Sequence, residues 1–231
     1  MAVITGSKRY RANRALIPGK GPFALGEAVK VLKKFKPAKF DETVELVMNL
    51  GIDPKKSDQM IRGAVSLPKG IGKNVRVIVF CKDDKTKLAL DAGAIAAGGD
   101  DLAAKIRDQN WLDFDVAIAT PDMMGVVGRL GKVLGPQGKM PSPKSGTVTP
   151  DLVKAVTEFR AGKIEFRADA YGNVHAPVGK LSFDAAALQE NVTALVDMIL
   201  HMKPAASKGK YINKVAISTT MGPSLILDIT G

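Results

Sequence analysis

The stretch "VRVIVFCKDDKTKLALDAG", residues 75–93, decides the fold class of the middle of the chain. Its first part, residues 75–80, is a continuous apolar run, which is typical of a strand buried on both faces. Its second part, residues 85–93, predicts a short helix that ends at a glycine. The order of strand and helix continues through "AIAAGGDDLAAKIRD" (94–108) and "FDVAIAT" (114–120). This alternation predicts a Rossmann-like α/β domain, in which helices pack on both faces of a parallel sheet.

Two Thr-Pro-Asp triplets mark the helix starts that follow in the same region. Threonine is a good N-cap residue, and proline is favoured at the first helical position. We therefore expect one helix to begin after Thr120 and another after Thr149, each with an aspartate in its first turn. The second helix is expected to end near Gly162, because glycine commonly terminates helices.

The two ends of the chain show a different pattern. In "FDETVELVMNLGID" (40–53) every second residue is apolar, which predicts a half-exposed strand. The segment "KIEFRADAYGNVHAPVG" (163–179) predicts a hairpin that turns near residues 171–173. The remaining elements expected here are amphipathic helices over residues 24–35 and 183–202 and strands over residues 211–219 and 224–229. Together they indicate an antiparallel sheet with helices, which is an α+β arrangement.

These two patterns predict a discontinuous domain with a second domain inserted into it. Residues 1–67 and 161–231 are expected to form a split α+β domain of the split β-α-β type. Residues 68–160 are expected to form the inserted α/β domain. Both joins contain glycine and could act as hinges.

Positive charge is concentrated near the start of the chain. The formal net charge is +11, and residues 1–70 hold 14 Lys or Arg against 6 Asp or Glu. Residues 71–159 hold 12 against 11 and are nearly neutral. The opening "MAVITGSKRYRANR" (1–14) is expected to be a solvated basic arm. This distribution favours a polyanionic partner, such as nucleic acid, for part of the molecule.

Composition argues against a membrane or exported protein. We find no apolar run of the roughly 18 residues that a spanning helix needs, and the first residues lack the apolar core of a secretory signal. The single cysteine, Cys81, cannot form an internal disulfide and is expected to be a small buried residue. A reducing compartment such as the cytoplasm fits this usage.

The motifs of nucleotide enzymes fail on inspection. The turn "CKDDKTK" (81–87) has no glycine and two acids, so a pyrophosphate could not approach its backbone. "GRLGKVLG" (128–135) and "GPQGKMP" (135–141) resemble phosphate-binding loops, but their lysines are not followed by Ser or Thr. With two histidines and one cysteine, the chain also lacks the ligands of a zinc cluster. We therefore expect no catalytic residues, no metal and no cofactor.

The half-exposed strand begins with a candidate RNA-binding surface, "AKFDETVE" (38–45). Lys39 could meet a phosphate, the Phe40 ring could stack on a base, and the Thr43 hydroxyl could bond a ribose 2′-hydroxyl. Glu45 repels phosphate but can accept hydrogen bonds from 2′-hydroxyl or amino groups. Alternation alone leaves open the other reading of Phe40, in which its ring closes the core.

A second candidate surface is "STTMGPS" (218–224), which follows the strand "KVAIS". Its hydroxyls are short donors and acceptors, Met221 offers a flexible apolar contact, and Gly222 allows another backbone to come close. An ordinary tight turn whose hydroxyls bond their own backbone is the alternative explanation.

Five segments together give a specific resemblance. They are "KFDETVELVMNLGIDPKKSDQMIRGAVSLP", "FDVAIATPDMMG", "LGPQGKMPSPKSGTV", "KIEFRADAYGNVHAPVGKLSF" and "STTMGPS". In this order they resemble the bacterial ribosomal protein L-one family over nearly the whole chain. The resemblance implies a cytoplasmic, non-enzymatic constituent of the large ribosomal subunit, whose split domain binds 23S rRNA in the mobile side stalk. It also implies that the stalk moves with deacylated tRNA leaving the exit site, and that the free protein represses its own operon by binding its mRNA.

The resemblance also assigns residues. "KFDET" and "TTMG" match the RNA-contacting segments of the family, and "HAPVGK" lies close to them. The residues expected to bind RNA are Lys39, Phe40, Thr43, Glu45, Arg167, His175, Lys180, Ser218, Thr219, Thr220, Met221 and Gly222. The "LGPQGKMP" segment (134–141) lies in the insert, where its glycines could simply shape an exposed loop.

Two other hypotheses remain at this stage. A nucleotide-dependent enzyme built on the insert would melt at a higher temperature when nucleotide is added. A general basic RNA chaperone would bind RNA without preference for sequence or shape.

Overall fold

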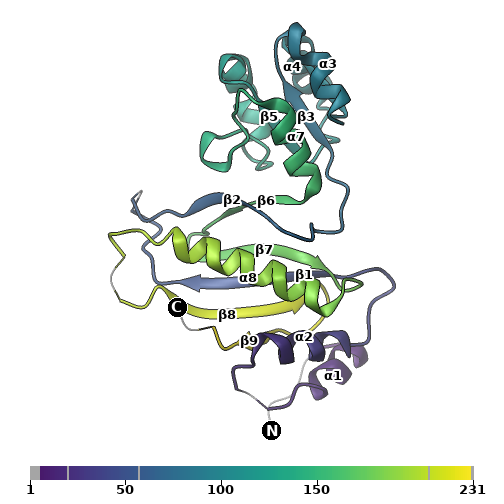
Figure 1. Cartoon of the computed structure of the whole chain (residues 1–231), viewed down its shortest axis with the longest axis vertical. Coiled ribbons are helices and arrows are strands. Elements are labelled where there is room, and N and C mark those ends of the chain that lie inside the picture. Colours follow the sequence, from purple (N-terminus) through teal and green to yellow (C-terminus); the bar gives the residue numbers. More distant parts are fainter. Residues whose placement is uncertain (1–5, 20, 57, 208, 230–231) are drawn as a thin grey trace. The chain divides into compact units, whose positions relative to one another are not determined.

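The structure, a computed structural model, describes residues 6–19, 21–56, 58–207 and 209–229 (Figure 1). The chain divides into two compact units. Residues Met1–Gly72 and Phe166–Gly231 form the first, which we call the split unit, and residues Lys73–Glu165 form the second, the inserted unit. The first five residues of the expected basic arm lie outside the described residues.

The inserted unit is built on a parallel three-stranded sheet, as the sequence predicts. Its strands are β3 (Val77–Phe80), β4 (Ala96–Gly98) and β5 (Val116–Ala119), in the order β4-β3-β5. Helix α3 (Asp83–Asp91) connects β3 to β4, and α4 (Asp100–Gln109) connects β4 to β5. Each connection is a strand–helix–strand crossover, which is why the three strands run in the same direction.

The apolar strand β3 is buried on both faces, so the inserted unit has two hydrophobic cores. Ile78 and Phe80 face one core, which contains buried residues of α4 and of the segment after β5. Val77 and Val79 face the other, which contains residues of α3 and α7 (Leu152–Ala161). Cys81 is fully buried in this second core, as expected.

The single helix expected after Thr120 is instead three short pieces. Thr120 and Pro121 occupy the N-cap and first positions as predicted, but the turn they begin, η1 (Pro121–Met123), is a 3-10 helix. Two short helices follow, α5 (Met124–Arg129) and α6 (Gly131–Leu134). The glycines of "GVVGRLG" explain the interruption, because each glycine disfavours a helix by about 1 kcal/mol relative to alanine.

Helix α7 starts two residues later than predicted. Asp151, not Thr149, occupies the N-cap position, and its carboxylate accepts a hydrogen bond from the Lys154 N–H at 3.3 Å. The Thr149 hydroxyl accepts from the Asp151 N–H at 3.2 Å and so shapes the preceding turn. Gly162 ends the helix in a left-handed conformation (φ 119°), as expected.

The split unit contains a four-stranded antiparallel sheet in the order β7-β1-β8-β9. Its strands are β1 (Thr43–Leu50), β7 (Asn173–Lys180), β8 (Ile212–Thr219) and β9 (Leu225–Leu227). The alternation predicted for β1 is confirmed, since the inward residues are buried: Val44, Leu46, Met48 and Leu50.

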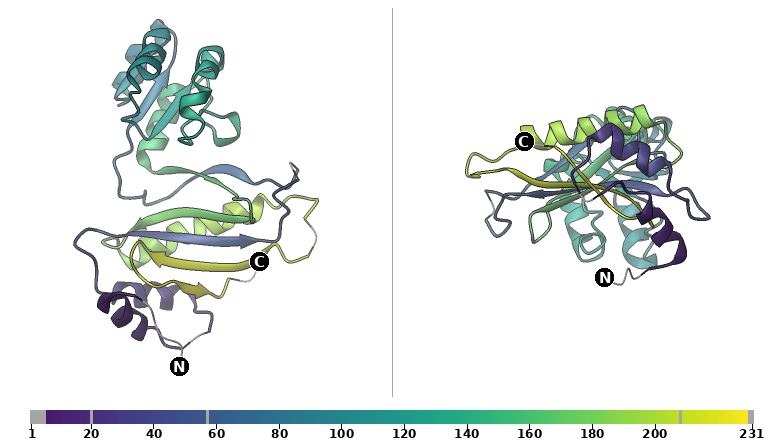
Figure 2. Two further views of the ribbon diagram at one scale, coloured as in Figure 1. Left: turned by 180° about the vertical axis from the view of Figure 1, so that it is seen from behind. Right: turned by 90° about the horizontal axis from the view of Figure 1, so that it is seen from below.

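Two helices cover one face of this sheet. They are α2 (Leu25–Lys33) and α8 (Ala185–His201), and their buried apolar residues include Val29, Leu32 and Leu195. Seen from behind, β7, β1 and β8 lie in front of α8, and within the described residues of the split unit neither α2 nor α8 lies on that side (Figure 2, left). We call this side the open face of the sheet.

The hairpin predicted over residues 163–179 forms only at its turn. Strand β6 (Lys163–Arg167) pairs with β2 (Arg62–Ser66), while β7 pairs with β1. The turn between β6 and β7 does exist, with one antiparallel bridge from Ala168 to Val174. Alternation along a strand shows which residues face inward, but it does not show which strand is the neighbour.

The basic opening segment is a helix where it is described, not a solvated arm. Helix α1 (Lys8–Ala15) is capped by the Ser7 side chain, which accepts from the Tyr10 N–H at 3.2 Å. Asn13 is buried, and its amide bonds the backbone of Lys36 through both oxygen (2.8 Å) and nitrogen (3.2 Å). These contacts fix α1 to the segment that follows α2.

Candidate RNA-binding site

The two stretches predicted to bind RNA meet where β1 begins and β8 ends. In the sheet register, Glu45 lies opposite Ser218, and Thr43 lies opposite Lys180 of β7. The Thr220 N–H donates to the Thr43 carbonyl, and the Thr43 N–H donates to the Thr220 hydroxyl, both at 3.0 Å. We name this surface the entry patch; it consists of Lys39, Phe40, Thr43, Glu45, Lys180, Ser218, Thr220 and Met221.

A buried carboxylate, Glu42, joins the three segments that surround the entry patch. One carboxylate oxygen accepts from the Ala38 N–H at 2.7 Å and from the Arg9 guanidinium at 3.0 Å. The other accepts from the Met221 N–H at 3.0 Å. Helix α1, the segment that precedes β1 and the turn after β8 therefore share one acceptor group, the Glu42 carboxylate, which is only 2% exposed.

The hydrogen bonds keep Glu42 ionised. Burial by itself raises the pKa of this carboxyl group. The Met221 N–H, the Thr219 hydroxyl and the Ala38 N–H, together with the charge of Arg9, lower it by more, so the net pKa lies below the usual 4.5. An ionised acceptor makes stronger hydrogen bonds than a neutral one, which favours a fixed geometry for the patch.

Thr219 and Gly222 support the patch from beneath. Thr219 faces inward opposite Val44 and is 4% exposed. Its hydroxyl donates a hydrogen bond to the Glu42 carboxylate. A Cβ atom at Gly222 would lie 2.3 Å from the Thr219 Oγ1 and 3.3 Å from a ring carbon of Phe35. The turn therefore requires glycine for internal packing, whatever approaches it from outside.

Two large apolar side chains of the patch are exposed. Phe40 is 52% exposed and Met221 is 51% exposed. Of the two readings left open for Phe40, the structure therefore supports exposure, since the ring does not close the core. Because Ala38 and Met221 both donate to Glu42, the two apolar side chains project from segments that are tied to each other.

The polar groups beside them are also held in place. The Lys180 ammonium donates to the Thr43 hydroxyl at 2.9 Å, which brings a positive charge to the start of β1. Asp41 accepts from both the N–H (3.2 Å) and the hydroxyl (2.7 Å) of Ser182, which ties the segment before β1 to the segment after β7. Lys39 and Glu45 are exposed. The patch thus offers cations, hydroxyls, one carboxylate and two apolar surfaces.

Two predicted residues lie away from the entry patch. Arg167 is the last residue of β6, in the other small sheet, and its guanidinium lies 4.0 Å from the Met60 sulfur. His175 lies on the open face opposite Val47, about 13 Å along β1 from Thr43. Its Nε2 is 3.8 Å from the Asp169 carboxylate.

Sequence reasoning missed Glu42, although the sequence contained the signal. Glu42 precedes Val44, Leu46 and Met48 in the same alternation, so it belongs to the buried face of the strand. A charged residue at a buried position needs hydrogen-bond partners, and this requirement could have identified it.

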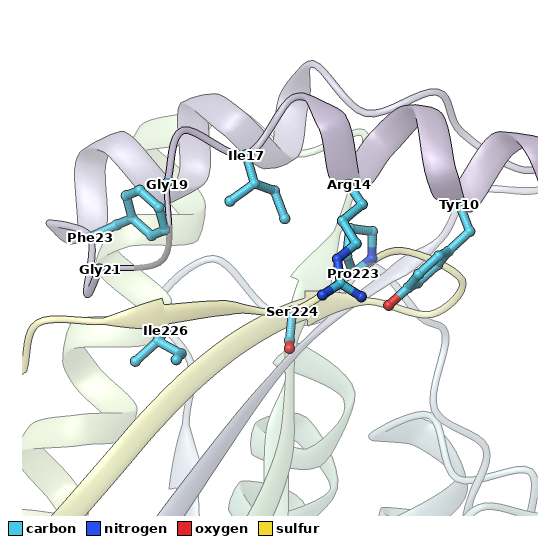
Figure 3. Close-up of a pocket in the computed structure, with 9 residues that line it drawn as sticks. All are labelled: Tyr10, Arg14, Ile17, Gly19, Gly21, Phe23, Pro223, Ser224 and Ile226. Atoms are coloured by element: carbon cyan, nitrogen blue, oxygen red, sulfur yellow. The ribbon is translucent and has the colours of Figure 1, made fainter. Parts of the chain in front are cut away.

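A hollow of about 490 Å³ lies next to the patch (Figure 3). Tyr10 and Arg14 of α1 point toward the segment Pro223–Ser224, which continues the turn after β8. The other lining residues are Ile17, Gly19, Gly21, Phe23 and Ile226. None of these described lining residues belongs to the predicted RNA-binding set.

Neither a metal centre nor a membrane span emerges from the described residues. Within residues 6–19, 21–56, 58–207 and 209–229, His, Cys, Asp and Glu side chains form no group of three or more that could hold a metal ion. In the same part of the chain, no helix is long and apolar enough to cross a bilayer.

An antiparallel sheet with one open face, edged by cations and exposed apolar groups, is typical of an RNA-binding protein. Residues 32–223 match the model of the ribosomal protein L1p/L10e family, and the chain belongs to this family. It is 53% identical over 222 residues to the large ribosomal subunit protein uL1 of Nocardioides sp. (strain ATCC BAA-499 / JS614), covering 96% of this chain and 92% of that protein. It is 52% identical over 222 residues to the protein of the same name from Pseudarthrobacter chlorophenolicus, covering 96% and 94%.

The family resemblance inferred from the sequence is therefore confirmed. Membership in a family of structural ribosomal proteins also settles the class of activity: the protein is not an enzyme. The hypothesis of a nucleotide-dependent enzyme built on the insert is accordingly wrong.

Proposed function

We propose that the chain is a structural constituent of the large ribosomal subunit in the bacterial cytoplasm and that it binds 23S rRNA in the mobile side stalk through the entry patch. The names of its relatives support the first part. The observation that carries the second part is the pair of exposed apolar side chains, Phe40 and Met221, held beside Lys180 and two hydroxyls by the buried Glu42.

Each group of the patch has a role in this proposal. The Phe40 ring and the Met221 thioether cover the flat faces of bases or sugars. Lys39 and Lys180 neutralise phosphates. The hydroxyls of Thr43, Thr220 and Ser218 bond the 2′-hydroxyls that distinguish RNA from DNA, and Glu45 accepts from 2′-hydroxyl or amino groups. Thr219 and Gly222 position the turn from beneath.

His175 and Arg167 take a secondary role. His175 shares the open face with the patch and would contact a larger RNA, whereas Arg167 would contact only RNA that extends past β6. Both are proposed as peripheral contacts.

The finer functions also belong to this proposal. The split domain, predicted over residues 1–67 and 161–231, anchors the protein to rRNA. The inserted domain, predicted over residues 68–160, assists the movement and release of deacylated tRNA from the exit site. The free protein represses translation of its own operon, because its mRNA offers a site that resembles the rRNA.

The test is a salt titration of binding to a stalk-type 23S rRNA fragment and to an unrelated hairpin. Phe40→Ala and Met221→Ala should each weaken binding to the stalk fragment by about 1–3 kcal/mol, because each removes an apolar contact with a base or sugar. Phe40→Tyr keeps the ring and should bind nearly as the parent does. Met198→Ala, which removes a partly exposed methionine on α8, is the matched control.

Specific binding predicts that the preference for the stalk fragment persists as salt is raised. Equal affinity for both RNAs, with a steep salt dependence and no effect of either substitution, would mean that the protein reads only phosphates. That result would favour the general RNA chaperone and would overturn the specific site.

A further inference from the structure

The open face of the sheet continues well beyond the entry patch. In the register of the strands, His175, Val47 and Ala216 lie in one row across the sheet. The next row contains Asn173, Asn49 and Lys214. This last row lies about 20 Å along β1 from Thr43, at the opposite end of the same face.

Three asparagines form a directed chain of hydrogen bonds at this end. The Asn213 amide nitrogen donates to the Asn49 amide oxygen at 3.2 Å, and the Asn49 nitrogen donates to the Asn173 oxygen at 2.8 Å. The Asn173 nitrogen donates to the Asp169 carboxylate at 3.0 Å. We call Asn213, Asn49 and Asn173 the amide row.

Asp169 fixes the direction of the amide row. A carboxylate can only accept, so the Asn173 amide must present its nitrogen to Asp169 and its oxygen to Asn49. The Asn49 amide is then oriented in the same sense. After these bonds, Asn49 and Asn173 each retain one N–H and one oxygen lone pair. Both side chains are partly exposed, so these remaining groups can reach a partner.

Asp169 also holds an exposed aromatic residue. Its carboxylate accepts from the backbone N–H groups of Asn173 and Tyr171, both at 2.8 Å. These bonds, with that of the Asn173 side chain, hold the pKa of Asp169 below its usual value. Tyr171 is 83% exposed, more than any other exposed large apolar residue of the described chain. A hydrogen-bonded turn therefore presents the exposed Tyr171 ring two residues before Asn173 of the amide row.

We propose that Tyr171 and the amide row form a second RNA-contacting site, which stacks one unpaired base on the Tyr171 ring and bonds base edges or 2′-hydroxyls through the asparagine amides. The inference rests on the proposed rRNA binding and extends it to the far end of the open face. The whole face then holds one RNA at two points about 20 Å apart.

Three observations favour RNA as the occupant. The row lies on the same uncovered face as the entry patch, so a single extended RNA can reach both. Lys214 lies opposite Asn49 in the register of the strands, next to the amide row, and the sequence of the split unit holds 20 Lys or Arg against 11 Asp or Glu. Fixed amides beside an exposed ring are the groups with which proteins read unpaired bases.

The experiment measures the affinity of the full chain for stalk-type 23S rRNA fragments of increasing length. Tyr171→Ala should weaken binding of the longest fragment about tenfold, while Tyr171→Phe should bind like the parent because it keeps the ring. Asp169→Asn should also weaken binding, because a neutral amide no longer fixes the direction of the row. The shortest fragment that still binds should not respond to these changes.

Met221→Ala is run beside them, because it separates two kinds of failure. If Met221→Ala weakens binding while Tyr171→Ala binds every fragment like the parent, the far site is wrong and the entry patch stands. If neither substitution has an effect, the proposed rRNA binding itself fails. A Tyr171→Ala protein that binds rRNA normally but loses a protein of the large subunit would mean that this surface binds protein, which also overturns the inference.

Discussion

Two segments of the molecule contain hydroxyls that are hydrogen-bonded within the protein, and these hydrogen bonds differ in range. At the entry patch, Thr219 and Thr220 bond Glu42 and Thr43, which lie more than 170 residues earlier in the chain. In the "LGPQGKMPSPKSGTV" loop of the inserted unit, Ser145 and Thr147 bond Ser142 and each other. The first set joins distant segments, whereas the second is confined to one short turn.

This difference indicates what each segment is for. Local hydrogen bonds shape a loop, here around the 3-10 turn η2 (Pro143–Ser145) and the left-handed Gly146. Long-range hydrogen bonds fix side chains from separate segments relative to one another, as a binding surface requires. The exposed Phe40 and Met221 stand beside the long-range set, which supports the entry patch as the functional surface.

The largest effect is expected from Glu42→Gln. The amide would point a donor at backbone N–H groups that need an acceptor, and it would remove the charge that pairs with Arg9. We expect the free energy of unfolding to fall by about 3 kcal/mol at pH 7, measured by urea denaturation. The exposed Glu45→Gln should change it by less than about 0.5 kcal/mol.

The pH dependence gives this prediction a second readout. The folded-state pKa of Glu42 lies below the usual 4.5, so its contribution is fully present above pH 4.5 and is lost as the pH falls through the folded-state pKa. The gap between the parent and Glu42→Gln should therefore shrink in acid. A gap that stays constant from pH 7 down to pH 3 would mean that the ionised carboxylate does not hold the patch together.

A smaller effect is expected from Gly222→Ala. The new methyl group would collide with the Thr219 hydroxyl, so the turn must shift, at a cost of about 2 kcal/mol in stability. A double-mutant cycle with Thr219→Ala tests this reason, because removing the hydroxyl makes room for the methyl group. The cost of Gly222→Ala should then be clearly smaller in the Thr219→Ala background.

RNA affinity, measured for the same set of variants, distinguishes two reasons for the glycine: close approach of RNA and internal packing. If Gly222→Ala weakens RNA binding equally in both backgrounds, close approach of RNA is the reason for the glycine. If binding recovers together with stability, internal packing is the reason.

Much of the fold could be predicted from the sequence because it depends on local patterns. The alternation of β1 and the apolar run of β3 follow from burial, which the residues themselves record. The partner of β6 could not be predicted, because several strands of similar pattern compete for it and only the whole fold selects one. Helix α1 was missed for a related reason: its contacts, Arg9 with Glu42 and Asn13 with Lys36, are long-range.

The candidate site was predictable as two segments but not as a surface. "KFDET" and "STTMG" could be identified from residue types. The candidate residues of both segments were, however, all assigned to RNA contact, without separating those that face outward from those that face inward. Alternation could have placed Thr219 inward, since Thr219, Ile217 and Val215 share one face of β8. The shared acceptor Glu42 and the internal need for Gly222 required the tertiary structure, because each depends on atoms from the other segment.

The smallest effects are expected from two serine-to-alanine substitutions, one in each segment of the comparison. Ser145→Ala removes a buried hydroxyl that bonds the Ser142 carbonyl at 3.2 Å and should cost the inserted unit about 1 kcal/mol in stability. Because its partners are local, affinity for the stalk fragment should change less than twofold. Ser218→Ala, on the open face opposite Glu45, should weaken RNA binding by about 1 kcal/mol and leave stability nearly unchanged.

Thermal unfolding and RNA titration of both variants provide the check, since each variant serves as the other's control. A loss of RNA affinity in Ser145→Ala equal to that in Ser218→Ala would show that the loop of the inserted unit takes part in binding. The distinction between local and long-range hydrogen bonds would then fail as a guide to the functional surface, and the 134–147 loop would have to be counted among the RNA contacts.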